Sequence, residues 1–342
     1  MRNSIELQKR LMPDVMEIMK KRYTILQQVR HSNLIGRRAL AASLSMSERV
    51  LRAETDFLKS QGLLEIHTSG MQISEAGIRL LEELEPELKG LFDLSELEDK
   101  LRRYFNLKQV WVVAGDSETS LHTKKELGRV ASEALKKAMS GNDIIAVTGG
   151  TTLALAADQL HSQVPLRGVK FVPARGGLGE SVDYQANTIV STMAKRVGAQ
   201  YRLLHVPDHL GEEAYQSLMQ EPNIREIVEV IRSARIVFHG IGDAMVMARR
   251  RKVREEMITA MKEEGALAEA FGFYFNKEGS VVHRTQTAGL RLEDIQDAEV
   301  VIGVAGGRSK GEAIGAVMSF GHNDILVTDE AAAKEMIANY QL

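Results

Sequence analysis

A short run of glycines and threonines is the first place where this sequence can do chemistry. A buried apolar run ends at Val147, and Gly149-Gly150-Thr151-Thr152 then opens a helical pattern. The first amides of a helix lack partners within it and carry partial positive charge, and glycine lets a phosphate approach the backbone closely. The segment predicts a cradle for an anion, although a tight turn with a helix cap would use the same residues.

Two further apolar runs end in glycines beside a cation. Arg175-Gly176-Gly177 follows one run, and Gly306-Gly307 lies just before Lys310 after another. Ligands of open α/β sheets bind at the carboxyl ends of the strands, so we expect the three loops to converge, with Arg175 and Lys310 neutralising phosphate oxygens. Because cradle and cations lie on separate loops, a ligand with two anionic groups is the most natural occupant.

The elements that position these loops alternate between short apolar runs and helical patterns. This alternation predicts a doubly wound, Rossmann-like parallel sheet with right-handed crossover helices. We expect strands at residues 109–113, 144–147, 170–172, 201–204, 236–238, 300–304 and 325–327, and helices at 124–139, 152–161, 223–233 and 311–320.

The N-terminal segment has a different pattern, that of a winged helix-turn-helix. Helices are expected at 24–30 and 36–44, a third begins after an N-cap at Ser47, and strands at 63–67 and 71–73 form a hairpin. In the third helix we expect Val50, Leu51, Ala53, Phe57 and Leu58 to face inward. A recognition helix presents its first turns to base edges, with cations beside phosphates, so the candidate DNA-binding residues are Arg37, Arg38, Ser47, Arg49, Arg52, Thr55, His67 and Thr68.

Charge and composition fit this division. Residues 1–80 hold 13 Lys and Arg against 8 Asp and Glu, whereas the whole chain of 342 residues has a net charge of −2. A basic module on an acidic body suits contact with DNA. The chain has no cysteine, no secretory signal and no apolar run of about 20 residues, so we expect a cytoplasmic protein without a membrane span. We place the DNA-binding domain at 1–89 and the effector-binding and oligomerisation domain at 90–342.

The sequence resembles the SorC family of bacterial sugar-operon regulators. In the N-terminal module the resemblance lies in Ser47-Glu48-Arg49-Val50-Leu51-Arg52-Ala53-Glu54 and Leu58-Lys59-Ser60-Gln61-Gly62-Leu63. Farther along, it lies in Thr148 to Thr152, Gly240-Ile241-Gly242-Asp243, Gly265 to Glu269 and Ala305 to Lys310. The family shares its effector-domain fold with sugar-phosphate isomerases and glucosamine-phosphate deaminases.

The resemblance implies a function. Within the family the likeness is strongest to regulators of glycolytic genes, which implies a repressor that fructose 1,6-bisphosphate releases from operator DNA, acting as a homo-oligomer of two or four subunits. No cofactor and no metal ion are expected. The candidate effector-binding residues are Gly149, Gly150, Thr151, Thr152, Arg175, Gly176, Gly177, Gln185, Arg250, Glu269 and Lys310.

Three alternatives remain open. A sugar-phosphate isomerase or deaminase would need a general acid or base, for which Asp243 and Glu269 are the nearby candidates, but the histidine that active relatives carry after the Gly-x-Gly loop is missing. A nicotinamide-sensing repressor would need Gly-x-Gly-x-x-Gly, and Gly240-Ile241-Gly242-Asp243-Ala244-Met245 lacks the third glycine. His205 and His209 have the spacing of metal ligands, but Pro207 between them disfavours a shared helix.

Arg250, in a basic run, fits a ligand contact or a subunit contact equally well.

Overall fold

The structure, a computed structural model, divides the chain into two compact units between Glu96 and Leu97. It describes residues 11–32, 34–44, 46–91, 94–177, 181–208 and 210–341. Within these ranges, none of the helices is both long and apolar enough to cross a membrane.

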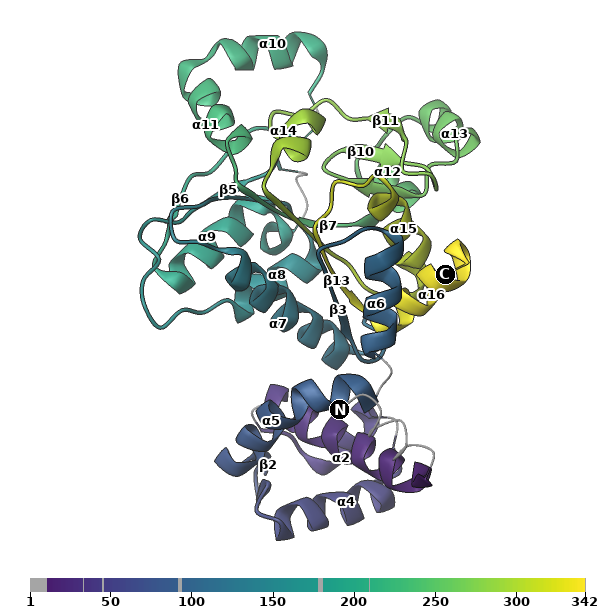
Figure 1. Cartoon of the computed structure of the whole chain (residues 1–342). Coiled ribbons are helices and arrows are strands. Elements are labelled where there is room, and N and C mark those ends of the chain that lie inside the picture. Colours follow the sequence, from purple (N-terminus) through teal and green to yellow (C-terminus); the bar gives the residue numbers. More distant parts are fainter. Residues whose placement is uncertain are drawn as a thin grey trace. The chain divides into compact units, whose positions relative to one another are not determined.

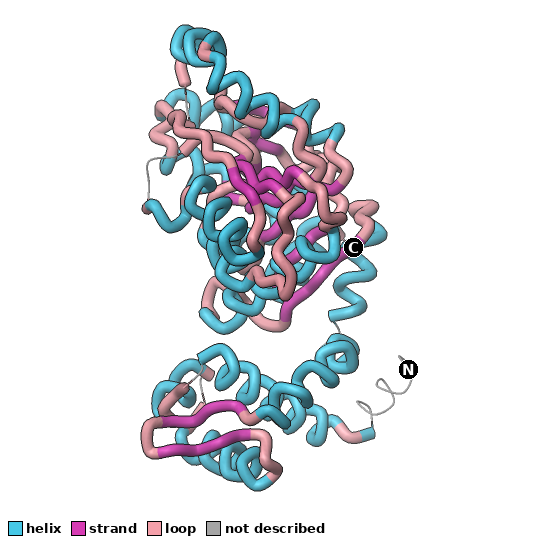
Figure 2. The backbone as a smooth tube through the Cα atoms, turned by 90° about the vertical axis from the view of Figure 1, so that its left-hand side faces the viewer, coloured by secondary structure: helices cyan, strands magenta, loops and turns pink. Residues whose placement is uncertain are grey.

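The N-terminal unit is a helical domain with a two-stranded hairpin (Figure 2). Ser47 accepts a hydrogen bond of 3.3 Å from the amide of Val50, so the expected N-cap is present. The hairpin pairs Leu64 with Ile73 in antiparallel register. The order of elements is that of a winged helix-turn-helix, with α2 (Pro13–Ser32), α3 (Arg37–Ser43), α4 (Glu48–Ser60), β1 (Leu64–His67), β2 (Gly70–Ile73) and α5 (Glu75–Leu91).

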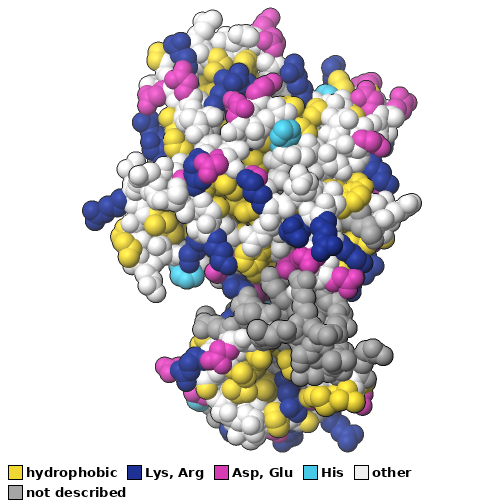
Figure 3. Space-filling view, in the orientation of Figure 1, with side chains coloured by type: hydrophobic (Ala, Val, Ile, Leu, Met, Phe, Trp, Pro, Cys, Tyr) yellow, Lys and Arg dark blue, Asp and Glu magenta, His cyan; other side chains and the backbone are white. Residues whose placement is uncertain are grey.

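The inward face of α4 is narrower than its apolar pattern predicts. Leu51 and Leu58 are buried, but Ala53 is exposed, and Val50 and Phe57 are 41% and 39% exposed. The guanidinium carbon of Arg22 lies 3.6 Å from the centre of the Phe57 ring, so a cation on α2 covers part of that ring. Apolar atoms accordingly reach the surface of this unit (Figure 3).

The C-terminal unit is built on a seven-stranded parallel sheet (Figure 1). Its strand order is β3-β13-β12-β7-β4-β5-β6. The strands are β3 (Gln109–Val113), β4 (Ile144–Val147), β5 (Lys170–Pro173), β6 (Gln200–Tyr201), β7 (Ile236–Gly240), β12 (Val300–Val304) and β13 (Ile325–Asp329). Six of the expected strands are confirmed, whereas β6 shares only Tyr201 with the strand expected at 201–204.

Helices cover both faces of this sheet, as expected of a doubly wound fold. On one face, side chains such as Ile145, Val147 and Phe238 pack against α7 (Leu121–Ala138), α8 (Thr151–Gln159) and α9 (Ala186–Val197). Intervening side chains such as Ala146 and Val237 are fully buried on the other face. The remaining helices near the sheet are α6 (Leu94–Tyr104), α10 (Glu212–Gln220), α11 (Pro222–Arg232), α14 (Leu292–Asp297), α15 (Gly311–Ser319) and α16 (Glu330–Tyr340).

A second, antiparallel sheet was not expected. Its order is β11-β10-β9-β8, formed by β8 (Gly242–Asp243), β9 (Ala268–Ala270), β10 (Phe273–Phe275) and β11 (Val281–Arg284). With α12 (Ala244–Arg250) and α13 (Glu255–Glu263) it forms a small lobe with its own core around Ala248, Ile258 and Tyr274. Strands of two to four residues are too short to show a period in the sequence.

Candidate functional site

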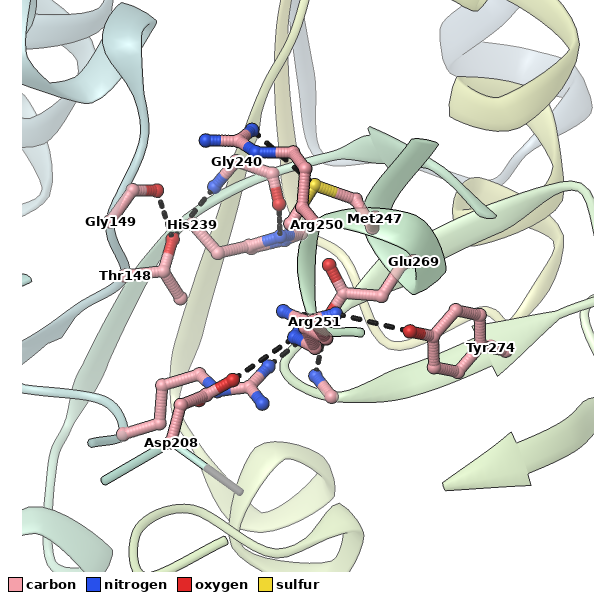
Figure 4. A network of polar contacts seen from close by, with 12 residues as sticks. Thr148, Gly149, Asp208, His239, Gly240, Met247, Arg250, Arg251, Glu269 and Tyr274 are labelled. Atoms are coloured by element: carbon pink, nitrogen blue, oxygen red, sulfur yellow. Dashed lines mark hydrogen bonds and ion pairs between the residues drawn. The ribbon is translucent and has the colours of Figure 1, made fainter. Parts of the chain in front are cut away.

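A pocket opens where the strand order of the parallel sheet reverses. From β4 the chain proceeds outward through β5 and β6, and from β7 it proceeds the other way through β12 and β13. The loops after β4 and β7 therefore diverge, which is where open α/β sheets bind ligands. The amide of Gly240 donates a 3.0 Å hydrogen bond to the hydroxyl of Thr148, and this bond ties the two loops together beside the pocket (Figure 4).

The cradle after β4 requires its glycines. Gly150 has φ +133°, a conformation that side chains disfavour, and a Cβ on Gly149 would lie 2.7 Å from the carbonyl oxygen of Tyr184. That carbonyl accepts a 2.9 Å hydrogen bond from the amide of Gly150. The helix α8 begins at once at Thr151, without a side-chain cap, so its first amides face the pocket as donors for an anion.

The ammonium group of Lys310 is a cation in the pocket wall. It lines the pocket, and burial together with the nearby charges of Lys124 and Arg250 holds its pKa below the usual value, against the opposing effect of Glu118 and Asp329. No carboxylate of the described residues lies within ion-pair distance of its ammonium group. A desolvated charge without a counter-ion favours binding of an anionic ligand.

Carboxylates behind the pocket fix the loop that carries Lys310. The buried Asp329 accepts hydrogen bonds from the amides of Ser117, Gly307 and Ala332 at 2.8, 2.7 and 2.9 Å. Glu118 accepts two more from Ser309 at 3.0 and 3.1 Å. These bonds join the loops after β3 and β12 and position Lys310.

Two arginines and two carboxylates form a buried network in the pocket wall (Figure 4). Arg175 pairs with Asp208 through Nε and with Glu269 through Nη1, the latter at 3.0 Å. Arg251 pairs with the same two carboxylates, each at 3.0 Å, and donates to the hydroxyl of Tyr274 at 3.3 Å. Burial alone would raise the pKa of Glu269, but Arg251 and Arg175 outweigh it and lower that pKa.

The structure brings the expected effector residues together. Every one of them lines the pocket: Gly149, Gly150, Thr151, Thr152, Arg175, Gly176, Gly177, Gln185, Arg250, Glu269 and Lys310. Asp208 and Glu269 balance the charge of Arg175, although its buried Nη2 has no hydrogen-bond partner among the described residues, and no carboxylate among them pairs with Lys310.

Sequence reasoning missed several residues of the wall: Thr148, Tyr184, Asp208, Gly240, Met247, Arg251 and Phe271. For Arg251 a signal was present, because successive residues at a helix end point about 100° apart, so Arg250 and Arg251 must face different partners.

The structure also bears on the alternatives. Asp243 caps α12 by accepting a 2.8 Å bond from the amide of Val246, and Glu269 is held by two arginines, so both candidate acid–base groups have other partners. After β7 the chain enters the strand β8, which pairs with β9. A dinucleotide-binding Gly-x-Gly-x-x-Gly motif would instead lead from the strand directly into a helix. His209 lies outside the described residues, and among those described no group of three potential ligands is suited to a metal ion.

On the N-terminal unit, most candidate DNA-binding side chains are at the surface. Arg38, Arg49 and Arg52 are exposed, as are Ser47, His67 and Thr68, and Arg37 is partly buried. Thr55 is an error of the prediction: its side chain is fully buried and its hydroxyl bonds to the carbonyl of Arg52 at 3.1 Å, so it belongs to the core under the helix.

Two family models match the chain. The model described as "Putative sugar-binding domain" matches residues 89–338, and the model described as "CggR N-terminal DNA binding domain" matches residues 18–88.

Known proteins match along the same length. The Central glycolytic genes regulator of Priestia megaterium is 48% identical over 341 residues, covering 99% of this chain and 100% of the relative. The regulator of the same name from Bacillus subtilis is 47% identical over 337 residues, covering 98% and 99%. The crystal structure of a "putative SorC family transcriptional regulator" from Enterococcus faecalis superposes with a TM-score of 0.66 at 41% identity, covering 71% of this chain and 99% of that one.

Proposed function

Given that the chain belongs to the SorC family of sugar-binding transcriptional regulators, we propose that it represses glycolytic genes and that fructose 1,6-bisphosphate weakens its hold on operator DNA. The proposed effector is a regulatory ligand, and the protein performs no catalysis on it. It acts in the cytoplasm as a homo-oligomer of two or four copies, so that paired winged helices add their phosphate contacts on one operator.

The observation that carries the proposal is the desolvated, unpaired ammonium of Lys310 beside Arg250. It lies in the same pocket as the uncapped amides of α8, so the pocket has an anion site on each of two separate elements. The same pocket holds the carboxylate of Glu269, which suits sugar hydroxyls and disfavours a third anionic group. A sugar with two phosphates matches this set of groups.

The test is thermal unfolding of the full chain with fructose 1,6-bisphosphate, fructose 6-phosphate, inorganic phosphate and NADH. A ligand at 100 times its Kd stabilises the folded state by about 2.7 kcal/mol. We expect the bisphosphate to raise the Tm most, and to release operator DNA in a band-shift titration. If NADH alone raises the Tm, or if none of the sugar phosphates raises it, the proposal is refuted.

A variant ties the response to the site. Lys310→Gln removes the unpaired cation, and we expect it to weaken bisphosphate binding by about tenfold or more, the effect of one charge-assisted contact. Lys195→Gln makes the same change of charge at an exposed position of α9 and is the matched control. Equal weakening in both variants would mean that net charge, and not the pocket, controls binding.

A further inference from the structure

The network in the pocket wall joins two parts of the effector domain. Arg175 and Asp208 follow β5 and β6 of the parallel sheet, whereas Arg251 directly follows α12 and Glu269 lies in β9, both in the small lobe. Each part contributes one arginine and one carboxylate. The ion pairs Arg175–Glu269 and Arg251–Asp208 join one part to the other. The four side chains are at most 7% exposed. The pocket lies over this junction.

The donors in this network select one oxygen of Glu269. Its Oε1 receives Arg175 Nη1 at 3.0 Å, Arg251 Nη2 at 3.0 Å and the amide of Gly272 at 2.6 Å. No hydrogen bond from the described part of the chain reaches its Oε2. Figure 4 shows one carboxylate oxygen of Glu269 turned away from Arg251. The carboxylate is thereby held in one orientation with a second oxygen left to accept a bond from a ligand.

Arg251 is the residue that spans this arrangement. Its side chain is 4% exposed and bonds to Asp208, Glu269 and Tyr274 at once. Arg250, the preceding residue and the last of α12, lines the same pocket. The end of α12 thus places one arginine in the pocket wall and the next one against the carboxylates, so a change at either alters the geometry available to the other.

We propose that Arg251 is a positioning residue for the effector: it fixes Asp208 and Glu269 so that Oε2 of Glu269 accepts a hydrogen bond from a hydroxyl of the bound sugar. The inference rests on the proposed function, because it assumes a hydroxylated ligand in this pocket. Arg251 acts through these partners, since its guanidinium bonds to Asp208, Glu269 and Tyr274.

A pH profile separates this role from a purely structural one. The groups that face Glu269 are Arg175, Arg251 and the amide of Gly272, with Asp208 and Tyr274 one contact farther away and His239 neutral nearby. In the Arg251→Met variant the buried carboxylate keeps only one cation, so its pKa rises and it becomes protonated as the pH falls. The ratio of variant Kd to wild-type Kd cancels the titration of the sugar phosphates themselves.

The experiment is calorimetric titration of the full chain with fructose 1,6-bisphosphate at pH 6.5, 7.5 and 8.5. We expect Arg251→Met to weaken binding by about tenfold at pH 6.5, as for one lost bond to a charged group, and by less at pH 8.5. Adding Glu269→Gln to that variant removes the titrating group, so its ratio should not depend on pH. Arg249→Met, at an exposed position two residues earlier in the chain, should bind as wild type does.

The outcomes are distinguishable. If the wild type binds no sugar phosphate, the proposed function fails, whatever Arg251 does. If the wild type binds and Arg251→Met binds equally well, or is weakened by the same factor at every pH, the positioning role is refuted. Should Arg251→Met not fold, Arg251→Lys decides, because an ammonium keeps the charge but cannot span three partners. We expect this variant to weaken bisphosphate binding threefold or more, on the order of half a charged hydrogen bond. Unchanged affinity would overturn the inference.

Discussion

Lys310 and Arg251 are both cations of one pocket, and their partners separate their roles. Arg251 has two carboxylates at 3.0 Å, so its charge is satisfied by the protein itself. Lys310 has no such partner among the described residues, and burial together with the charge of Lys124 lowers its pKa. A balanced cation shapes a site, whereas an unbalanced one favours a ligand.

His239 provides a prediction at the same scale. It is completely buried after β7, with Nε2 at 2.8 Å from the side-chain oxygen of Asn323, and burial lowers its pKa from 6.5 to about 4 despite that contact, the carbonyl of Gly240 and the charge of Glu269. Because the folded pKa lies below the unfolded one, the stability that it contributes is present above pH 6.5 and is lost as the pH falls toward 4.

We therefore expect His239→Gln, which keeps a polar group opposite Asn323, to flatten the fall in stability between pH 6.5 and 4. The part removed is about 3 kcal/mol, from the size of the shift. Urea unfolding at several pH values, followed by the fluorescence of Trp111, the single tryptophan, measures it in the effector domain. Parallel pH curves for variant and wild type would show that another group is responsible.

Which residues line the pocket was largely predictable, whereas what each of them contacts was not. Glycines and cations after apolar runs mark loops at strand ends, which is local information. That Arg175 is already paired depends on Asp208, 33 residues away, and on Glu269, 94 residues away. Thr55 illustrates the same limit, since a polar residue beside two exposed arginines is indistinguishable in sequence from one that faces the core.

At the scale of elements, the two ends of the parallel strands have different tasks. The carboxyl ends carry the pocket, and the amino ends are clamped by an ion-pair cluster. Arg235, just before β7, bonds to Asp143 at 2.5 Å, to Glu299 at 2.9 Å and to the carbonyl of Ala138 at 2.7 Å. Burial would raise the pKa of Asp143, but bonds from Arg235 and Ser140 lower it to about 2.

From this we expect Asp143→Asn to destabilise the effector domain by about 2 kcal/mol at pH 7, the value of the pKa shift, without changing the Kd for the bisphosphate. The lowered folded pKa contributes stability above pH 3.8 that is lost as the pH falls toward 2, so the variant should differ least from wild type in acid. Urea unfolding and calorimetric titration report the two quantities. Asp158→Asn on the exposed face of α8 is the control, and a weakened Kd in Asp143→Asn alone would contradict the division of tasks.

The elements themselves were predictable where their pattern is long. Fully buried strands such as β7 and β12 are continuous apolar runs, and α7 has a regular apolar face. The small lobe was not predicted because β8 and β9 have only two and three residues and are separated by the 24 residues 244–267. Its position over the pocket, with Glu269 in β9, depends on tertiary contacts that no local pattern contains.

At the scale of the whole molecule, each of the two units carries a surface for a different ligand. The exposed Arg49 and Arg52 lie on α4, and the effector pocket lies in the other unit. An effector releases DNA only if it binds the DNA-free arrangement more tightly than the DNA-bound one, because equal affinities shift no equilibrium. The proposed repression therefore demands a coupling free energy between the two sites.

Such coupling is reciprocal, which yields the last prediction. If fructose 1,6-bisphosphate weakens operator binding by some factor, a saturating operator must weaken bisphosphate binding by the same factor, commonly about 5- to 150-fold. Calorimetric titration of the full chain with and without operator, beside operator titrations with and without bisphosphate, compares the two factors at one salt concentration, since DNA affinity depends steeply on salt. Arg49→Ala should weaken operator binding while leaving the Kd for bisphosphate, measured without DNA, as in the wild type. Lys310→Gln should show the opposite pattern. If the bisphosphate releases the operator from Lys310→Gln at the same concentration as from the wild type, the ligand acts by competing on the DNA-binding surface and not through the pocket.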